Sequence, residues 1–234
     1  MATNYFTLTY DTTGPASAVL QINTGAQYSN NVLVTCSITT SDSPTTGYQM
    51  IIWGDIDVAW GKSNGILKSS ATTATQSDAQ VIGYVNSKQI QLASGDGPKN
   101  LHVIIYDDVM NPSTQADASI TLETSLPSVN ISNGPDKTKI SSVANYNVCS
   151  FSFQCTVDIQ QYLVKVVTSS SSDHTVGVQI PTTGGSTFMS GGNTTANTII
   201  NAKIFAADLN TASAGEGAKI IKVFVQDMAG NWSV

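Results

Sequence analysis

One segment of the chain occurs twice. Residues 94–107 read SGDGPKNLHVIIYD and residues 214–227 read AGEGAKIIKVFVQD, so a gapless shift of 120 positions superposes the glycines, the acid between them, the lysine and the last aspartate. The match continues at two further pairs, Asn111 with Asn231 and Ser113 with Ser233. A self-match of this length at one spacing indicates tandem copies of a single structural module.

The composition favours short strands and turns. Of the 234 residues, 41% are hydrophobic and only 11% are charged, against a usual charged share of about 25%. Neutral polar residues and glycine take the remaining surface positions. The net charge is -6 and all 10 basic residues are lysine. Because phosphate and base recognition rely on arginine forks and basic patches, we expect no nucleic-acid partner.

The sequence shows neither a membrane span nor a secretion signal. No segment approaches the about 18 consecutive apolar residues that a span needs, and the first residues lack a basic segment followed by an apolar run. Cys149 and Cys155 fall on one face of an expected strand, about 20 Å apart, which is too far for a disulfide. We expect both to be reduced and to face a core beside Phe151 and Phe153, and Cys36 to be a buried thiol in another strand.

Short alternating segments separated by turn residues fill the chain. The strands expected in the first module are residues 18–23, 32–39, 48–53, 66–69, 81–85, 88–92 and 100–107. Those expected in the second are residues 128–132, 146–155, 162–167, 176–180, 199–205 and 219–227. We expect residues 182–198, which are rich in glycine, threonine and asparagine, to form a long exposed loop.

Two similar linkers divide the chain. Residues 11–15, DTTGP, and residues 123–127, ETSLP, share their threonine and serine content and their closing proline. Six or seven short strands in about 110 residues are typical of an immunoglobulin-like sandwich. The predicted fold is therefore all-β, with an N-terminal arm at residues 1–10, one immunoglobulin-like domain at residues 11–122 and a second at residues 123–234.

The two repeated segments resemble bacterial immunoglobulin-like repeats. The likeness lies in residues 92–103 and in residues 223–233, VFVQDMAGNWS, and the linker at residues 11–15 matches the start of such modules. It is weaker between these segments, and the first copy departs from it after Asp107. The resemblance implies tandem modules of the kind found in surface proteins and phage structural proteins. It implies little about function, because these scaffolds serve adhesion, assembly and spacing alike.

The histidines do not support a catalytic site. His102 lies within an expected strand and His174 in an expected loop, one in each module, with no matching acid and serine context. The nearest approach to a nucleophile elbow, residues 184–188, lacks its last glycine. We expect no enzymatic activity, no catalytic residues and no cofactor.

Acidic residues at the ends of the repeated strands are the candidates for a metal site. Asp107, Asp108 and Asp227 can in principle hold calcium, as carboxylates do at the ends of sandwich modules. The alternative is that Asp107 and Asp227 bind the backbone of their own turns and end the strand. Their matched positions favour the turns, because one intrinsic feature of the module then explains both.

Tryptophans are candidates for sugar stacking, since aromatic faces suit the apolar faces of sugars. Trp53 ends an apolar strand and is expected in the core, and Trp232 is expected to pack beneath its sandwich. Trp60 is the residue we expect to be exposed, and it is the candidate for contact with a glycan.

These features together predict a structural protein of a phage particle. The modules are of a surface type, yet the cysteines are unpaired and no signal peptide is evident. A virion protein combines both properties, because it is made in the host cytoplasm and released by lysis. We expect display on the virion surface, on head or tail, in many copies or as a homo-oligomer. The expected partners are a major capsid or tail protein and, as a further contact, host surface carbohydrate. The alternative is a glycan-binding adhesion module of a bacterial surface protein.

The N-terminal arm is the expected assembly segment. Residues 5–10, YFTLTY, alternate as a strand does, with Phe6, Leu8 and Tyr10 on one face and Tyr5 on the other. Such a strand can complete a sheet in a neighbouring subunit. It can equally pair within its own chain.

Overall fold

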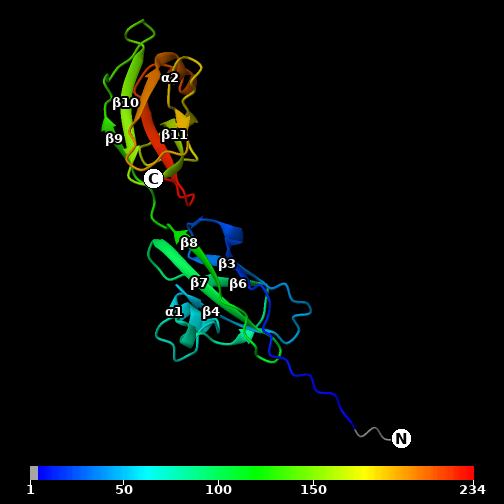
Figure 1. The fold of residues 1–234 in the computed structure, drawn as a ribbon. Coiled ribbons are helices and arrows are strands. Elements are labelled where there is room, and N and C mark those ends of the chain that lie inside the picture. Colours follow the sequence, from blue (N-terminus) through cyan, green and yellow to red (C-terminus); the bar gives the residue numbers. More distant parts are fainter. Residues whose placement is uncertain (1–4) are drawn as a thin grey trace. The chain divides into compact units, whose positions relative to one another are not determined.

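The computed structural model describes residues 5–234, which form two compact units (Figure 1). The first unit extends to Glu123 and the second runs from Thr124 to Val234. The division falls at the start of the linker expected at residues 123–127. Each unit has a hydrophobic core of its own.

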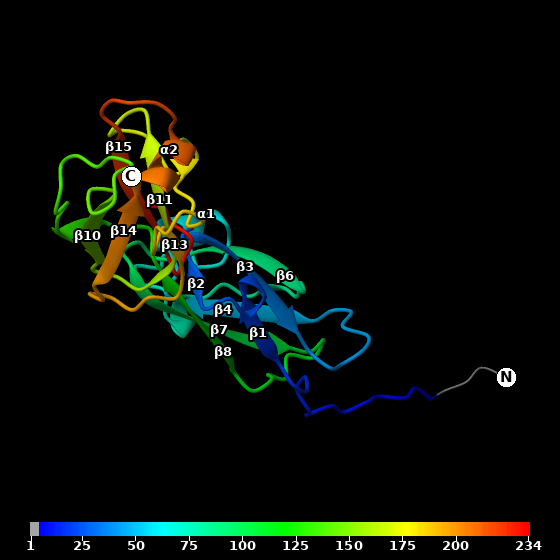
Figure 2. The ribbon, with the colours of Figure 1, turned by 90° about the horizontal axis from the view of Figure 1, so that it is seen from above.

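The first unit contains two sheets. One consists, in spatial order, of β1 (Val19–Ile22), β3 (Leu33–Thr39) and β6 (Ser87–Gln91) (Figure 2). The other consists, in spatial order, of β2 (Tyr28–Ser29), β8 (Ala116–Leu122), β7 (Gly97–Tyr106), β4 (Gln49–Gly54) and β5 (Ile82–Gly83). Neighbouring strands are antiparallel, except that β2 runs parallel to β8. The connections include α1 (Val58–Ser63) and the 3-10 turns η1 (Asn23–Gly25) and η2 (Gln76–Asp78).

The first core lies between these two sheets because their strands alternate. In β3, Val34, Cys36 and Ile38 are buried, and the residues between them are more exposed. In β7, Leu101, Val103 and Ile105 are fully buried in the same way. Successive side chains of a strand point to opposite faces, so both sheets present their apolar residues to one interior.

The second unit repeats this plan with fewer strands. One sheet consists, in spatial order, of β14 (Ile200–Phe205), β10 (Val148–Cys155) and β9 (Val129–Asn133). In the other sheet β11 (Ile159–Val167) is central and pairs with β12 (Val178–Gln179), β13 (Ser190–Gly191) and β15 (Ile220–Asp227). The helix α2 (Ala206–Ala212) follows β14. Phe153 and Phe224 are the largest fully buried side chains of this unit.

The predicted fold class is confirmed. Both units are β-sandwiches, and the first has the strand order of the immunoglobulin fold, with three strands facing a sheet that has β7 near its centre. Most expected strands are present with shifted ends. The expected strand at residues 66–69 is wrong, because only Leu67 makes a bridge, to Ala79. The strand β8 and the helix α1 were not expected.

Two further expectations need correction. Residues 5–10 form no strand within the described chain and are exposed. The predicted exposed loop at residues 182–198 is partly buried and contains β13. Its Ser186 and Met189 are buried, because the Asp208 carboxylate accepts hydrogen bonds from the N–H groups of Gly184 (2.6 Å) and Ser186 (2.8 Å) and holds the loop against α2.

Candidate functional site

The repeated segment begins with the same hairpin in both units. Gly95 and Gly97 have φ of 88° and 119°, and Gly215 and Gly217 have 86° and 116°. These left-handed conformations favour glycine, which explains why glycine recurs at both positions. The following lysine closes each hairpin in the same way, since its Nζ donates to a backbone carbonyl five residues earlier at 3.3 Å in both copies.

The segment ends with an aspartate turn that also recurs. One carboxylate oxygen of Asp107 accepts from the N–H groups of Val109 (3.0 Å) and Asn111 (2.7 Å), and the other from the Asn111 side-chain amide (2.8 Å). In the second unit, Asp227 makes the same contacts with Ala229 (3.0 Å) and with the backbone (2.8 Å) and side chain (2.9 Å) of Asn231. The expectation that these aspartates bind their own turns is therefore met by both copies.

The carboxylate oxygens of Asp107 and Asp227 have few free positions at which a cation could bind. Both oxygens of each turn aspartate are occupied by N–H donors, whose positive ends occupy the directions from which a metal ion approaches. Burial raises the pKa of Asp107, but hydrogen bonds from Asn111 and Val109 outweigh it, and the pKa lies below its ordinary value. Asp108 is exposed. Within residues 5–234, no three histidine, cysteine, aspartate or glutamate side chains gather as metal ligands do.

A serine completes each turn, and it allows a matched test of the repeat. The Ser113 hydroxyl accepts from the buried N–H of Ile105, and the Ser233 hydroxyl from that of Val225, each at 3.0 Å. Ser113→Ala is expected to lower the free energy of unfolding of the first unit by about 1–3 kcal/mol, because it leaves a buried donor unpaired. Ser233→Ala is expected to act equally on the second unit.

The measurement is denaturant unfolding followed separately for each unit. Asn64 and Thr211 are exposed, their side chains bond to carbonyls of their own helices, and they provide control sites for alanine substitution. Loss of stability in both units from either serine variant would contradict two self-contained modules.

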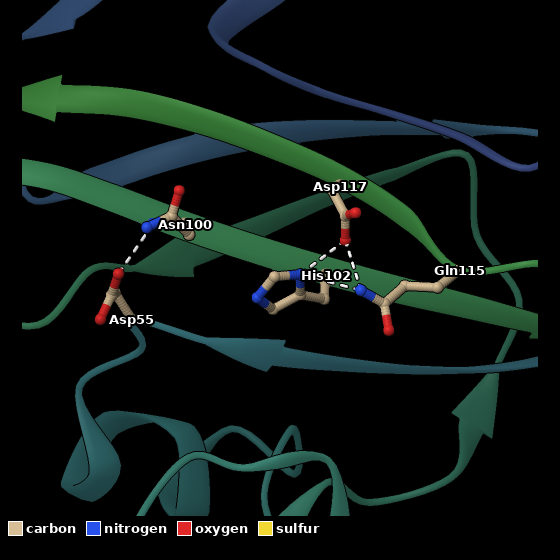
Figure 3. A network of polar contacts seen from close by, with 5 residues as sticks. All are labelled: Asp55, Asn100, His102, Gln115 and Asp117. Atoms are coloured by element: carbon tan, nitrogen blue, oxygen red, sulfur yellow. Dashed lines mark hydrogen bonds and ion pairs between the residues drawn. The ribbon is translucent and has the colours of Figure 1, made fainter.

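A polar cluster lies on the outer side of β7 and β8 (Figure 3). Nδ1 of His102 is 2.6 Å from Oδ1 of Asp117, and the Gln115 amide donates to the same oxygen at 2.6 Å. The His102 ring lies 5.4 Å from that of Trp53. At the other end of the view, Asp55 accepts from the backbone N–H of Asn100 at 2.8 Å (Figure 3). The hydrogen bond from His102, followed by that from Gln115, lowers the pKa of Asp117.

His102 and Asp117 form a hydrogen-bonded pair that contacts no nucleophile among residues 5–234. His102 and Asp117 are placed as the base and orienting acid of a triad are placed. In the part of the chain that is described, His102 contacts Asp117, Gln115 and Trp53, and none of these contacts is to a hydroxyl or thiol. The pair therefore ties β7 to β8 at the sheet surface. Sequence reasoning missed this pairing because β8 was not expected.

The tryptophans differ in their surroundings. Trp53 is buried, as expected, but in a small cluster with Ile51 and Ala79 that is separate from the main core of the first unit. Trp60 is half-buried and packs against the first core from α1, so the expectation of an exposed indole is wrong. Its place is fixed by the Asp57 carboxylate, which accepts the Trp60 N–H at 2.8 Å and begins the helix. Trp232 stacks on His174 with ring centroids 4.4 Å apart.

The cysteines are free thiols in the structure. Cys36 is fully buried, and burial raises its pKa to about 12. Cys155 lies in the second core near Phe153, as expected. Cys149 is only half-buried, which corrects the expectation that it faces the core: it lies toward the start of β10, where its Sγ is 3.5 Å from the carbonyl of Lys137.

The arm side chains have no core to cover them. Tyr5, Phe6, Leu8 and Tyr10 are 78%, 86%, 85% and 90% exposed. The chain first contacts the sandwich at Asp11, whose carbonyl accepts from the Asn111 amide at 3.3 Å. The structure therefore gathers four apolar side chains outside any core, beside the turn that ends the repeated segment.

Known proteins resemble this chain only weakly. No protein-family model matches the chain, and no curated protein matches it significantly. Among solved structures, the fibronectin(III)-like modules of Clostridium thermocellum CbhA match with a TM-score of 0.44 and 11% identity, over 92% of this chain and 90% of that one. A likeness of this size carries no argument, so the fold assignment rests on strand order. Among residues 5–234, no helix has the length and apolar character needed to cross a bilayer.

Proposed function

We propose that this chain is a non-enzymatic structural protein of a phage particle, displayed in many copies on the virion surface at head or tail. Its partners in this proposal are other virion proteins, a major capsid or tail protein among them, and further copies of itself. Its role is to dock and to present two rigid sandwiches, not to carry out a reaction.

The exposed arm is the observation that supports the proposal best. Four large apolar side chains on six residues of extended chain are costly to leave in water. Burial of each contributes on the order of 2 kcal/mol. A symmetric shell repeats such a contact many times, so a modest contribution from each arm suffices for retention.

The neutral polar surface agrees with the same role. With few charges and a net charge of -6, the chain lacks the basic surface that a nucleic-acid or anionic-membrane partner requires. Contact with host carbohydrate remains a secondary part of the proposal. It has less support, because the Trp60 indole packs against the first core.

Removal of the arm tests the proposal. A chain lacking residues 2–10 is expected to melt as the full chain does, since no described residue before Asp11 packs in a core. It is also expected to lose co-sedimentation with purified particles. Leu8→Asp is expected to lose binding as well, because it places a charge on the apolar face.

Thr9→Asp is the matched control, since it adds the same charge to the opposite face and is expected to bind. Undiminished binding of the shortened chain overturns the docking role of the arm. Unfolding of the first unit on its removal shows instead that the segment belongs to its own sandwich.

A further inference from the structure

The second sandwich has an open edge where the first has a strand. In the first unit β7 lies between β4 and β8, and β8 covers it from Gly97 to Val103. The 120-residue repeat places β15 in the position of β7. Among the described residues, β15 pairs with β11 along one edge, and no strand pairs with its other edge.

The backbone of β15 is oriented to receive a partner there. The N–H and C=O of Val225 are bonded to Ser233 on this side. Because alternate residues of a strand direct their hydrogen-bonding groups to the same edge, those of Val223 and Ile221 point the same way. Unpaired groups along a strand edge are a template for pairing with another chain.

Two side chains near the start of β15 are also less buried than their counterparts in β7, which β8 covers. Leu101 of β7 is fully buried, whereas Ile221 at the matching position of β15 is only half-buried. Lys99 is 8% exposed and its counterpart Lys219 is half-buried. Ile220, which stands where the first unit has Asn100, is an apolar side chain 42% exposed.

The arm resembles β8 in its pattern of apolar and hydroxyl residues, with one identical position, Thr9 and Thr121. With a shift of 112 positions, residues 7–10 (TLTY) superpose on residues 119–122 (SITL). The match continues into the linkers, where residues 11–15 (DTTGP) superpose on residues 123–127 (ETSLP). Leu8 and Tyr10 thus correspond to Ile120 and Leu122, the two side chains that β8 buries most deeply in the first core.

We propose that the arm of one copy adds to β15 of a second copy and completes its second sandwich, as β8 completes the first. In β7 and β8, Asn100 lies opposite Ser119 and Lys99 opposite Ile120. The same antiparallel register places Thr7 opposite Ile220, and Leu8 opposite Lys219. Phe6 then lies opposite the half-buried Ile221.

A second copy fits this edge better than a partner of other chemistry. The arm has the alternation of the strand that the first unit uses at this position, carries no charge from Tyr5 to Tyr10, and is otherwise unpaired. Each copy supplies one arm and one edge, so the numbers of donors and acceptors match. Such a heterologous contact extends head to tail. The inference goes beyond the proposed function and does not depend on a particle.

Cross-linking of purified full-length chains tests the register. Four single variants are made in a Cys149→Ala background: Thr7→Cys and Thr9→Cys in the arm, Ile220→Cys at the start of β15, and Ala218→Cys two residues before it. Mixed in pairs under mild oxidation, Thr7→Cys with Ile220→Cys and Thr9→Cys with Ala218→Cys are expected to form disulfide-linked dimers. The swapped pairs use the same four chains and are expected to yield several-fold less.

The matched and swapped pairs are expected to differ in yield because their Cβ atoms lie at different distances. Directly opposite residues have Cβ atoms about 4.5–5.5 Å apart, whereas diagonal neighbours are about 7–8 Å apart, and a disulfide needs about 3.5–4.5 Å. Alternation from Val225 places Ile220 and Ala218 at the non-hydrogen-bonded positions, where the side chains are closer.

Wild-type chains are also expected to associate with rising concentration, and chains lacking residues 2–10 are expected to stay monomeric.

Three results overturn the proposal. Equal yields from all four mixtures contradict the register, and no cross-link in any mixture of folded chains contradicts the contact. A chain carrying both Thr7→Cys and Ile220→Cys that closes its disulfide while remaining monomeric shows that the arm fills the edge of its own chain. Failure of particle binding leaves these measurements unaffected.

Discussion

Phe153→Ala is expected to lower the free energy of unfolding of the second unit by about 3–5 kcal/mol. Phe153 is fully buried, meets the Tyr162 ring edge-on at a centroid distance of 5.3 Å, and lies 6.0 Å from the Phe151 ring. Removal of its ring takes away buried apolar area and leaves a cavity that the paired strand β10 cannot close. The transition of the first unit is expected to stay unchanged.

Denaturant unfolding with probes in each unit measures this effect. Phe153→Leu is the graded control, and it is expected to lose less because it retains most of the apolar volume. A loss of stability shared by both units would contradict their separate cores, and a loss below about 1 kcal/mol would contradict the packing of Phe153.

Asp208→Ala is expected to destabilise the second unit by about 2–4 kcal/mol, because it leaves the N–H groups of Gly184 and Ser186 without their acceptor. The Asp208 side chain is 1% exposed, and its two oxygens serve these two donors at 2.6 and 2.8 Å. Proteolysis within residues 182–198 is expected to accelerate at the same time. Asp173→Ala is the control, since that carboxylate bonds only within its own exposed loop.

The Asp208 carboxylate also predicts how the stability of the second unit changes at acid pH. Burial raises the pKa of Asp208, but hydrogen bonds from Ser186, Gly184 and Thr183 outweigh it, and the pKa lies below its ordinary value of 3.8. Its contribution to stability is therefore complete above about pH 4 and is lost as the pH falls through the lower folded-state pKa. The Asp208→Ala variant is expected to lose less stability over this range than the wild type. Equal losses would contradict the role of the carboxylate.

The repeat made most of the fold predictable. Matching glycines, lysine, aspartate and serine mark the ends of β7 and β15, and the alternation between these marks defines the strands. The strand β8 was not predicted, although residues 116–122 alternate as a strand does and lie within the predicted first domain at residues 11–122. Missing β8 also hid the partner of His102, which is Asp117.

Other features required tertiary context. Nothing local in residues 182–198 shows that Asp208, some twenty positions later, draws this polar segment against the sandwich. Trp60 follows a turn aspartate, but only the packing of α1 on the first core shows that its indole is covered. For residues 5–10 the alternation is present but the strand is absent, because a strand needs a partner and these residues pair with no other segment of the described chain.

The most direct measurement of the central claim is the copy number of this chain in purified particles from cells that make it, determined by quantitative mass spectrometry. The account predicts many copies per particle in a fixed ratio to a shell or tail protein, and loss of those copies when residues 2–10 are removed. A chain that is folded and abundant in the soluble fraction but absent from the particles would contradict it.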